Sequence, residues 1–298
     1  MEKDQVITDL ALERMVKGEK LQNIDGTSVN TREEAFCKVT RIDILTDSAA
    51  QIVGKPCGRY ITLEIHQEEE LPCPSLVKTL AEELKYILND TIPKSVLIAG
   101  LGNRHIPPDS LGSRTIDKVA VSRKVAGYAG IPAEVSVSAI APGVLGITGI
   151  ETVEILKGIV NMIHPELVIA IDSLCARDIH KIANTIQITD TGINPGSGLG
   201  NNRMGINQET LGCPVVAVGV PMVVYARTIC HNAIELLIRR TSENTSDEVI
   251  DSVMNELTDG TINHLVVTPK DIDALTNDIS HIIASAMNKV FATEAFLS

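Results

Sequence analysis

The chain has 298 residues, a formal net charge of −12, and 44% hydrophobic but only 2% aromatic residues. This acidic balance excludes a nucleic-acid-binding protein with the usual basic surface. With so few aromatic residues and no Trp, a large hydrophobic core must be built mainly from Val, Ile, Leu and Ala, which favours a parallel sheet covered by helices.

Cysteine spacing and apolar patterning indicate a soluble protein with reduced thiols. None of the six cysteines forms a CxxC pair, so neither a zinc knuckle nor a thioredoxin-type site is expected. The N-terminus is charged and lacks a long apolar run, so we expect no secretion signal. The apolar stretches elsewhere are short and interrupted, and none should cross a bilayer.

Strands and helices are predicted to alternate along the chain. Residues 59–65 alternate as in a half-buried strand, and helical spacing of apolar residues predicts a helix over 74–88. The apolar run over 95–100 predicts a buried strand, and a loop rich in Gly, Pro and Asn follows over 101–112. Three further helices are predicted over 115–127, 150–163 and 228–239, and a final helix follows a capping signal at 268–271. Buried strands are predicted over 167–172 and 214–220, and another strand near 185–188. A small-residue segment covers 136–149, and a Gly-rich loop covers 190–203.

This alternation predicts an α/β protein with a mostly parallel sheet flanked by helices. In such sheets, ligands bind beyond the carboxyl ends of the strands. Two predicted loops, 101–112 and 172–178, leave strands at that edge, so we expect the functional site there.

Two carboxylates are the candidate catalytic residues. Asp172 ends the buried run LVIAID, and Asp109 lies in a Pro-Pro-Asp-Ser turn after the strand over 95–100. Each could instead cap a helix or form a turn, which are common roles of Asp. Two carboxylates delivered by neighbouring loops can share one site, where one is protonated and the other ionised. Such a pair can activate water and polarise a peptide carbonyl.

Other candidates have less support from their spacing. His105 and His180 lie near the two aspartates in sequence and could join them around a divalent metal, although a surface or capping role is the default for both. Four hydroxyl or thiol side chains lack a recognisable base, namely Ser110, Ser173, Cys175 and Ser197. The loop NPGSGLGN lacks the pattern of a nucleotide site, so we expect it to shape substrate binding or to contact another subunit.

Nine distinctive segments are spread nearly end to end: TDLALE (8–13), GRYITLEI (58–65), LIAGLGN (97–103), PDSLG (108–112), SAIAPGVLGITGIET (138–152), VIAIDSLCAR (168–177), TIQITDTGINPGSGLGNNR (185–203), ETLGCPVVAVGVPMVV (209–224) and HLVVTPKDID (264–273). Together they resemble the germination protease family, which degrades small acid-soluble spore proteins. The two motifs SAIAPGVLGITGIET and TDTGINPGSGLGN are too long and distinctive to match by chance.

The resemblance implies an endopeptidase of atypical aspartic type with Asp109 and Asp172 as the catalytic residues. It implies a homotetramer with a phosphorylase/hydrolase-like α/β fold similar to that of hydrogenase-maturation peptidases. It also implies small acid-soluble spore proteins as substrates, in the cytoplasm of the forespore or spore core. Neither a cofactor nor a metal is implied, and no direct contact with nucleic acid or membrane is expected. The alternative is a metal-dependent maturation-type peptidase, because the related hydrogenase-maturation peptidases use a metal.

The family is further described as a zymogen that removes a short leader from itself. TDLALE resembles the processing site and places the cleavage between Asp9 and Leu10. We therefore expect a propeptide-like leader over 1–9 in a polar, mobile N-terminus that a protease can reach.

The rest of the chain, residues 10–298, is expected to form a single α/β peptidase domain. A C-terminal helical segment is predicted over about 245–298. The stretch between about 241 and 262 is shorter than in longer members of the family, and we expect it to be a surface feature.

Overall fold

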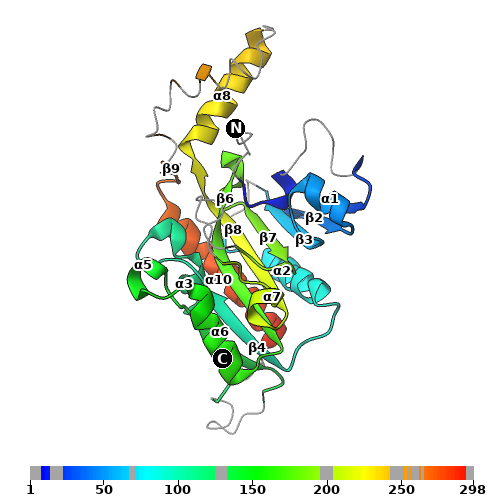
Figure 1. Cartoon of the computed structure of the whole chain (residues 1–298), viewed down its shortest axis with the longest axis vertical. Coiled ribbons are helices and arrows are strands. Elements are labelled where there is room, and N and C mark those ends of the chain that lie inside the picture. Colours follow the sequence, from blue (N-terminus) through cyan, green and yellow to red (C-terminus); the bar gives the residue numbers. More distant parts are fainter. Residues whose placement is uncertain are drawn as a thin grey trace.

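The computed structural model describes residues 8–13, 23–66, 71–124, 133–194, 204–241, 252–253, 256, 262 and 265–292. Its strands are β1 (Thr27–Glu33), β2 (Cys37–Ile44), β3 (Gly58–Ile65), β4 (Ser95–Gly100), β5 (Ser136–Ile140), β6 (Leu167–Ala176), β7 (Thr185–Thr189), β8 (Val215–Tyr225) and β9 (Val266–Val267). They form one sheet in the order β1-β2-β3-β7-β8-β6-β4-β5, with β9 paired to β8. The predicted α/β class is confirmed (Figure 1).

The sheet is divided into a parallel and an antiparallel half. β5, β4, β6 and β8 run parallel to one another, and the aliphatic runs of the sequence form β4, β6 and β8. β1, β2, β3, β7 and β9 are joined by antiparallel pairing. The parallel strands β4, β6 and β8 are buried along nearly their whole length, as expected where helices cover both faces.

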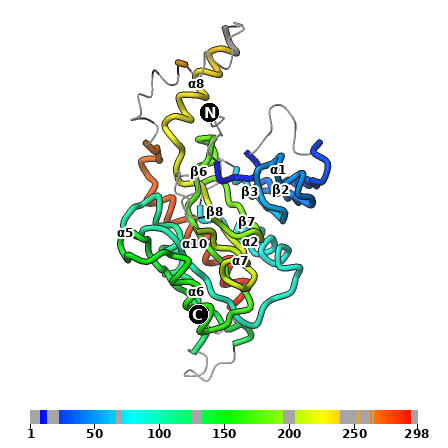
Figure 2. The backbone as a smooth tube through the Cα atoms, in the orientation of Figure 1, coloured from blue at the N-terminus to red at the C-terminus, as the bar shows by residue number. Residues whose placement is uncertain are grey.

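Three of the four longer helices in the described residues pack on the faces of the sheet, and the helix over 226–241 projects away from it (Figure 2). The longer helices are α2 (Pro74–Ile87), α6 (Thr152–Ile163), α8 (Ala226–Thr241) and α10 (Ile272–Phe291), and the short ones are α1 (Asp47–Val53), α3 (Leu111–Ile116), α5 (Leu145–Thr148) and α7 (Gln208–Leu211). Along β6, Ile169 packs in the core with α2 and α10, whereas its neighbours Val168 and Ala170 pack with α6. Successive side chains of a strand point to opposite faces, so these two cores lie on opposite sides of the sheet.

The C-terminal part returns to the sheet and packs on it. In Figure 2, α8 projects away from the sheet, and α10 then lies along the body of the molecule. The predicted final helix is confirmed as α10, but it begins at Ile272 with Asp271 as its N-cap and without a side-chain capping hydrogen bond, and the Thr268 hydroxyl donates to the Met222 carbonyl. Most of the stretch over 241–262 lies outside the described residues.

The predicted helix over 115–127 is wrong in its position. α3 begins at Leu111 and ends at Ile116, and residues 125–127 lie outside the described part of the chain. The amides of Ser122 and Arg123 donate to the Val137 carbonyl in β5, so the chain runs beside the sheet edge. Tertiary hydrogen bonds therefore override a weak local helical pattern.

The helices predicted over 74–88, 150–163 and 228–239 correspond to α2, α6 and α8, and their ends differ by a few residues. The strands predicted over 59–65 and 95–100 correspond to β3 and β4. None of the helices in the described ranges is both long and apolar enough to span a bilayer. The six cysteines are free thiols, as predicted.

Candidate active site

Asp172 lies where β4 ends and β6 continues. Gly100, the last residue of β4, is opposite Ile171 of β6, and the Leu101 amide still donates to the Ile171 carbonyl at 2.8 Å. Asp172 is the next residue of β6 and is only 5% exposed. It is opposite Gly219 of β8, where the space that a Cβ would take is filled by the Leu174 side chain.

The sequence-based expectation that the strand ends at Asp172 is therefore wrong. β6 runs on to Ala176, because β8 continues beside it through Val224. The predicted loop over 172–178 begins only after Ala176, and Asp172 cannot be the N-cap of a following helix. One of its carboxylate oxygens, Oδ1, accepts the amide of Ser173 at 2.9 Å.

Asp109 closes a short turn above the end of β4. It is the last residue of the 3-10 helix η3 (Pro107–Asp109), which packs against both β6 and β8. Its Oδ2 accepts the Asn103 amide at 2.7 Å, so the side chain also fulfils the alternative prediction of a turn-forming role. Gly102, at φ +89°, allows this closure, since a Cβ there would lie 2.1 Å from the Asp109 carbonyl oxygen.

Three backbone segments meet between the turn of Asp109 and the strand that carries Asp172. A Cβ on Gly112, in the first turn of α3, would lie 2.4 Å from the Leu101 nitrogen and 2.6 Å from the Ile171 oxygen. A Cβ on Gly100 would lie 2.2 Å from the Gly112 oxygen. Only glycine permits this approach, and it places the turn of Asp109 over the strand position that precedes Asp172.

The histidines do not join this arrangement in a metal-binding cluster. His105 is exposed on the loop before η3, and His180 is exposed in η4 (Ile179–Lys181), which follows the end of β6. Within the ranges that the structure describes, no group of three or more His, Cys, Asp or Glu side chains could hold a metal ion.

The hydroxyl and thiol candidates are placed as structural residues. Burial raises the pKa of the Cys175 thiol to about 12, with Asp9 and Glu13 adding to the shift, so the nucleophilic thiolate is disfavoured. Ser110 is fully buried, and its hydroxyl donates to the Pro107 carbonyl. The Ser173 hydroxyl is buried and has no hydrogen-bond partner among the described residues. Ser197 lies outside the described residues.

The segment over 8–13 is docked, which corrects the expectation of a mobile N-terminus there. The Asp9 amide donates to the Cys175 carbonyl at 3.0 Å, and Asp9 Oδ2 accepts the Cys175 amide at 2.9 Å. The Leu10 side chain is fully buried. The Glu13 carboxylate accepts the amides of Arg177 and Asp178, at 2.7 and 2.9 Å. Residues 8–13 are thus held by hydrogen bonds along the C-terminal end of β6.

Two side chains hold the peptide groups around Leu10. The Asp9 carbonyl accepts Lys55 Nζ at 2.8 Å and Gln187 Nε2 at 3.3 Å, and the Ala11 amide donates to Gln187 Oε1 at 2.7 Å. Gln187 on β7 is opposite Gly219, whose neighbour on β6 is Asp172. Opposed residues of a sheet point to the same face, so the segment docks on the face of Asp172. Sequence reasoning missed Lys55 and Gln187, because they are remote from residue 9 in the chain.

The family model described as germination protease matches residues 6–263. The chain belongs to the germination protease family. Its similar relatives include the germination proteases of Caldanaerobacter subterraneus subsp. tengcongensis, at 42% identity over 94% of this chain and 92% of the relative, and of Clostridium acetobutylicum, at 40% identity over 95% and 94%. The germination protease of Bacillus cytotoxicus is 35% identical over 95% of this chain and 92% of its own length.

Membership of the germination protease family makes the chain a protease of spore germination. A solved structure, the [NiFe] hydrogenase maturation protease HycI of Thermococcus kodakarensis, has a TM-score of 0.38 and 14% identity, covering 68% of this chain and 99% of that one. This similarity is too weak to support an inference about mechanism.

Proposed function

We propose that this germination protease is an aspartic endopeptidase that begins the degradation of small acid-soluble spore proteins. Asp109 and Asp172 are the proposed acid and base. The observation that carries the proposal is the glycine contact at Gly112, which delivers the turn of Asp109 to the strand edge beside Asp172. The resemblance of the sequence to the family further supports a homotetramer in the cytoplasm of the forespore or spore core, with no contact to nucleic acid or membrane.

The proposed chemistry needs one protonated and one ionised carboxyl group. Two carboxylates at close range share a proton because both cannot readily ionise together. The protonated group would donate to the carbonyl oxygen of the substrate, and the ionised group would take a proton from the attacking water. The partners of both side chains orient them: Asn103 holds Asp109, and the Ser173 amide holds Asp172.

Digestion of a small acid-soluble spore protein tests the proposal, with new termini mapped by mass spectrometry. We expect Asp109→Asn and Asp172→Asn each to lower kcat/KM by about 10²–10⁴ while the thermal midpoint is kept. The double variant should be little worse than either single one, because the two groups act as a unit. Asp117→Asn, an exposed acid after α3, is the matched control. A single variant that keeps more than about a third of the activity would exclude that residue.

We propose that the chain is made as a zymogen that cuts itself between Asp9 and Leu10. The docked segment lies on the face of Asp172, which supports its action as a tethered blocker at high effective concentration. Because Leu10 is fully buried and the flanking peptide groups are hydrogen-bonded, the segment must leave its place before the bond can be cut. The docking depends on the Asp9 and Glu13 side chains, which accept backbone amides, and we propose that acidification triggers the release of the segment.

Incubation at about pH 5–6 should therefore yield a new N-terminus that reads Leu-Ala-Leu-Glu, with a rise in activity. Glu13→Gln should accelerate processing, because a neutral side chain accepts the amides of Arg177 and Asp178 less strongly. Glu33→Gln, at an exposed position of β1, is the control and should process at the wild-type rate. The zymogen proposal fails if a protein that starts at Leu10 is no more active than the full chain.

A further inference from the structure

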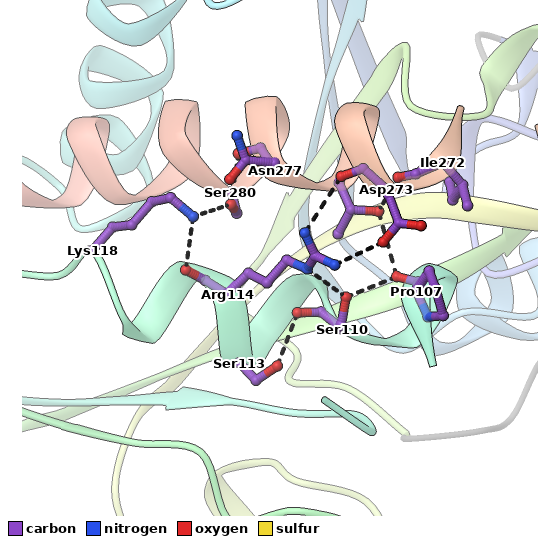
Figure 3. Close-up of polar contacts among 10 residues, drawn as sticks. Pro107, Ser110, Ser113, Arg114, Lys118, Ile272, Asp273, Asn277 and Ser280 are labelled. Atoms are coloured by element: carbon purple, nitrogen blue, oxygen red, sulfur yellow. Dashed lines mark hydrogen bonds and ion pairs between the residues drawn. The ribbon is translucent and has the colours of Figure 1, made fainter. Parts of the chain in front are cut away.

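A chain of hydrogen bonds ties the turn of Asp109 to the C-terminal helix α10 (Figure 3). Arg114, on α3, donates from Nε to the Ser110 hydroxyl at 2.9 Å. Its two other nitrogens donate to Asp273 in the first turn of α10, at 2.8 Å to Oδ1 and 3.4 Å to the carbonyl oxygen. One guanidinium therefore joins the residue after Asp109 to a helix from the other end of the chain.

The same network fixes the first residue of η3. The Ser110 hydroxyl donates to the Pro107 carbonyl at 2.8 Å, and the Thr276 hydroxyl of α10 donates to the same carbonyl at 3.4 Å. The single Thr276 proton also lies toward the Ile272 carbonyl, at 2.6 Å, so the main connection from the turn of Asp109 to α10 runs from Pro107 through Ser110 to Arg114. The turn also packs against β6 and β8, but Arg114 connects it by hydrogen bonds to a side chain of α10.

We infer that Arg114 is a positioning residue for Asp109. The inference rests on the proposed catalytic role of Asp109. Arg114 reaches Ser110 and Asp273 at once because the planar guanidinium presents several donors in fixed directions, which a lysine ammonium does not. An orientation error of about 1 Å in a catalytic group can lower the rate by about 10²-fold.

The exposure of the ion pair separates positioning from stability. The side chains of Arg114 and Asp273 are 32% and 67% exposed, and ion pairs this open to solvent add little to the free energy of unfolding. The apolar contacts of α10, such as the fully buried Ile279 and Ile283, hold the helix in place without Arg114. Loss of the guanidinium should therefore change the rate of the reaction much more than the thermal midpoint.

The test compares Arg114→Met and Arg114→Lys with the wild-type germination protease. We expect kcat to fall by at least about tenfold in both, with KM within about twofold, since substrate contacts are kept. Lys118→Met is the matched control, because Lys118 donates to Ser280 along the same seam between α3 and α10 but one turn further from Asp109. Its kcat should stay within about twofold of the wild type.

A second variant guards against misfolding, and a double-variant cycle assigns the effect. Asp273→Ala removes the carboxylate of α10 that accepts from Arg114, and it should also lower kcat. In an Asp109→Asn background, Arg114→Met should cause no further loss in the residual kcat, because its effect acts through Asp109. If Arg114→Met lowers kcat by the same factor in the wild-type and Asp109→Asn backgrounds, the positioning role is overturned. Wild-type kcat in both Arg114→Met and Asp273→Ala would also overturn the positioning role, without affecting the catalytic assignment. Full activity of Asp109→Asn itself would overturn both the catalytic assignment and the inference.

Discussion

Replacing Gly112 by alanine tests whether the backbone contact at the edge of β4 builds the site. The added Cβ would lie 2.4 and 2.5 Å from the nitrogen and oxygen of Leu101 and 2.6 Å from the Ile171 oxygen. Normal carbon contacts begin near about 3.5 Å, so the segments must separate by about 1 Å. Side-chain rotation cannot relieve the clash, because all three atoms belong to the backbone and Leu101 is hydrogen-bonded to Ile171.

Overpacking of this kind costs about 1–3 kcal/mol, and we expect the upper end of that range because the neighbours are held by the sheet. At about 2–4 °C per kcal/mol, the thermal midpoint of Gly112→Ala should fall by about 6 °C or more. A shift of about 1 Å in the turn of Asp109 should lower kcat/KM by about 10²-fold. Calorimetry and the digestion assay measure the two effects separately.

Gly158→Ala is the matched control for this prediction. Gly158 lies on the exposed side of α6, and no atom lies within 4 Å of the position of its Cβ. Alanine favours a helix over glycine by about 0.5–1 kcal/mol, so this variant should be slightly more stable than the wild type and fully active. A Gly112→Ala protein with the midpoint and activity of the wild type would refute the proposed close contact.

Three further outcomes are expected. Glu83→Gln should cost about 1–3 kcal/mol in urea denaturation, because the fully buried Glu83 carboxylate pairs with Arg32 and Arg41, and its loss removes the counter-charge of Arg41 while Arg32 keeps Glu34. At about pH 8, iodoacetamide should label the exposed Cys57 and leave Cys175 unmodified in intact-protein mass spectra, since the high pKa of Cys175 keeps it protonated. Proteolysis should survive EDTA; loss of activity that one added metal restores would favour the metal-dependent alternative.

The sequence predicted three of the four parallel strands, β4, β6 and β8, because they are continuous aliphatic runs, whereas β5 (SVSAI) was predicted only as a small-residue segment. It did not predict β1 and β2 at the other edge. β1 (TSVNTRE) is mostly polar and partly exposed, and its order comes from pairing with β2 rather than from burial. The local pattern of apolar residues identifies buried strands. An edge strand such as β1 instead depends on pairing with another strand, which its own sequence pattern does not show.

The sequence proposed two residues for the candidate site, but it did not predict how the fold places them. Sequence reasoning placed Asp172 at a strand end, because the apolar run stops there. In the structure, a polar residue continues the strand, since the neighbouring β8 still offers hydrogen bonds. The step between the short β4 and the longer β6 therefore creates the edge that the sequence attributed to a loop.

The tie between Arg114 and Asp273 has a consequence for the order of synthesis. The two residues are 159 positions apart in the chain, so the turn of Asp109 leaves the ribosome long before its partner helix exists. Translation proceeds from the N-terminus, so an early segment cannot form its contacts with a late segment until the late segment has been synthesised. A growing chain thus carries both aspartates for much of its synthesis without the helix that steadies one of them. If the turn of Asp109 needs α10 for its active position, the nascent protein should not cleave other proteins before α10 has been translated.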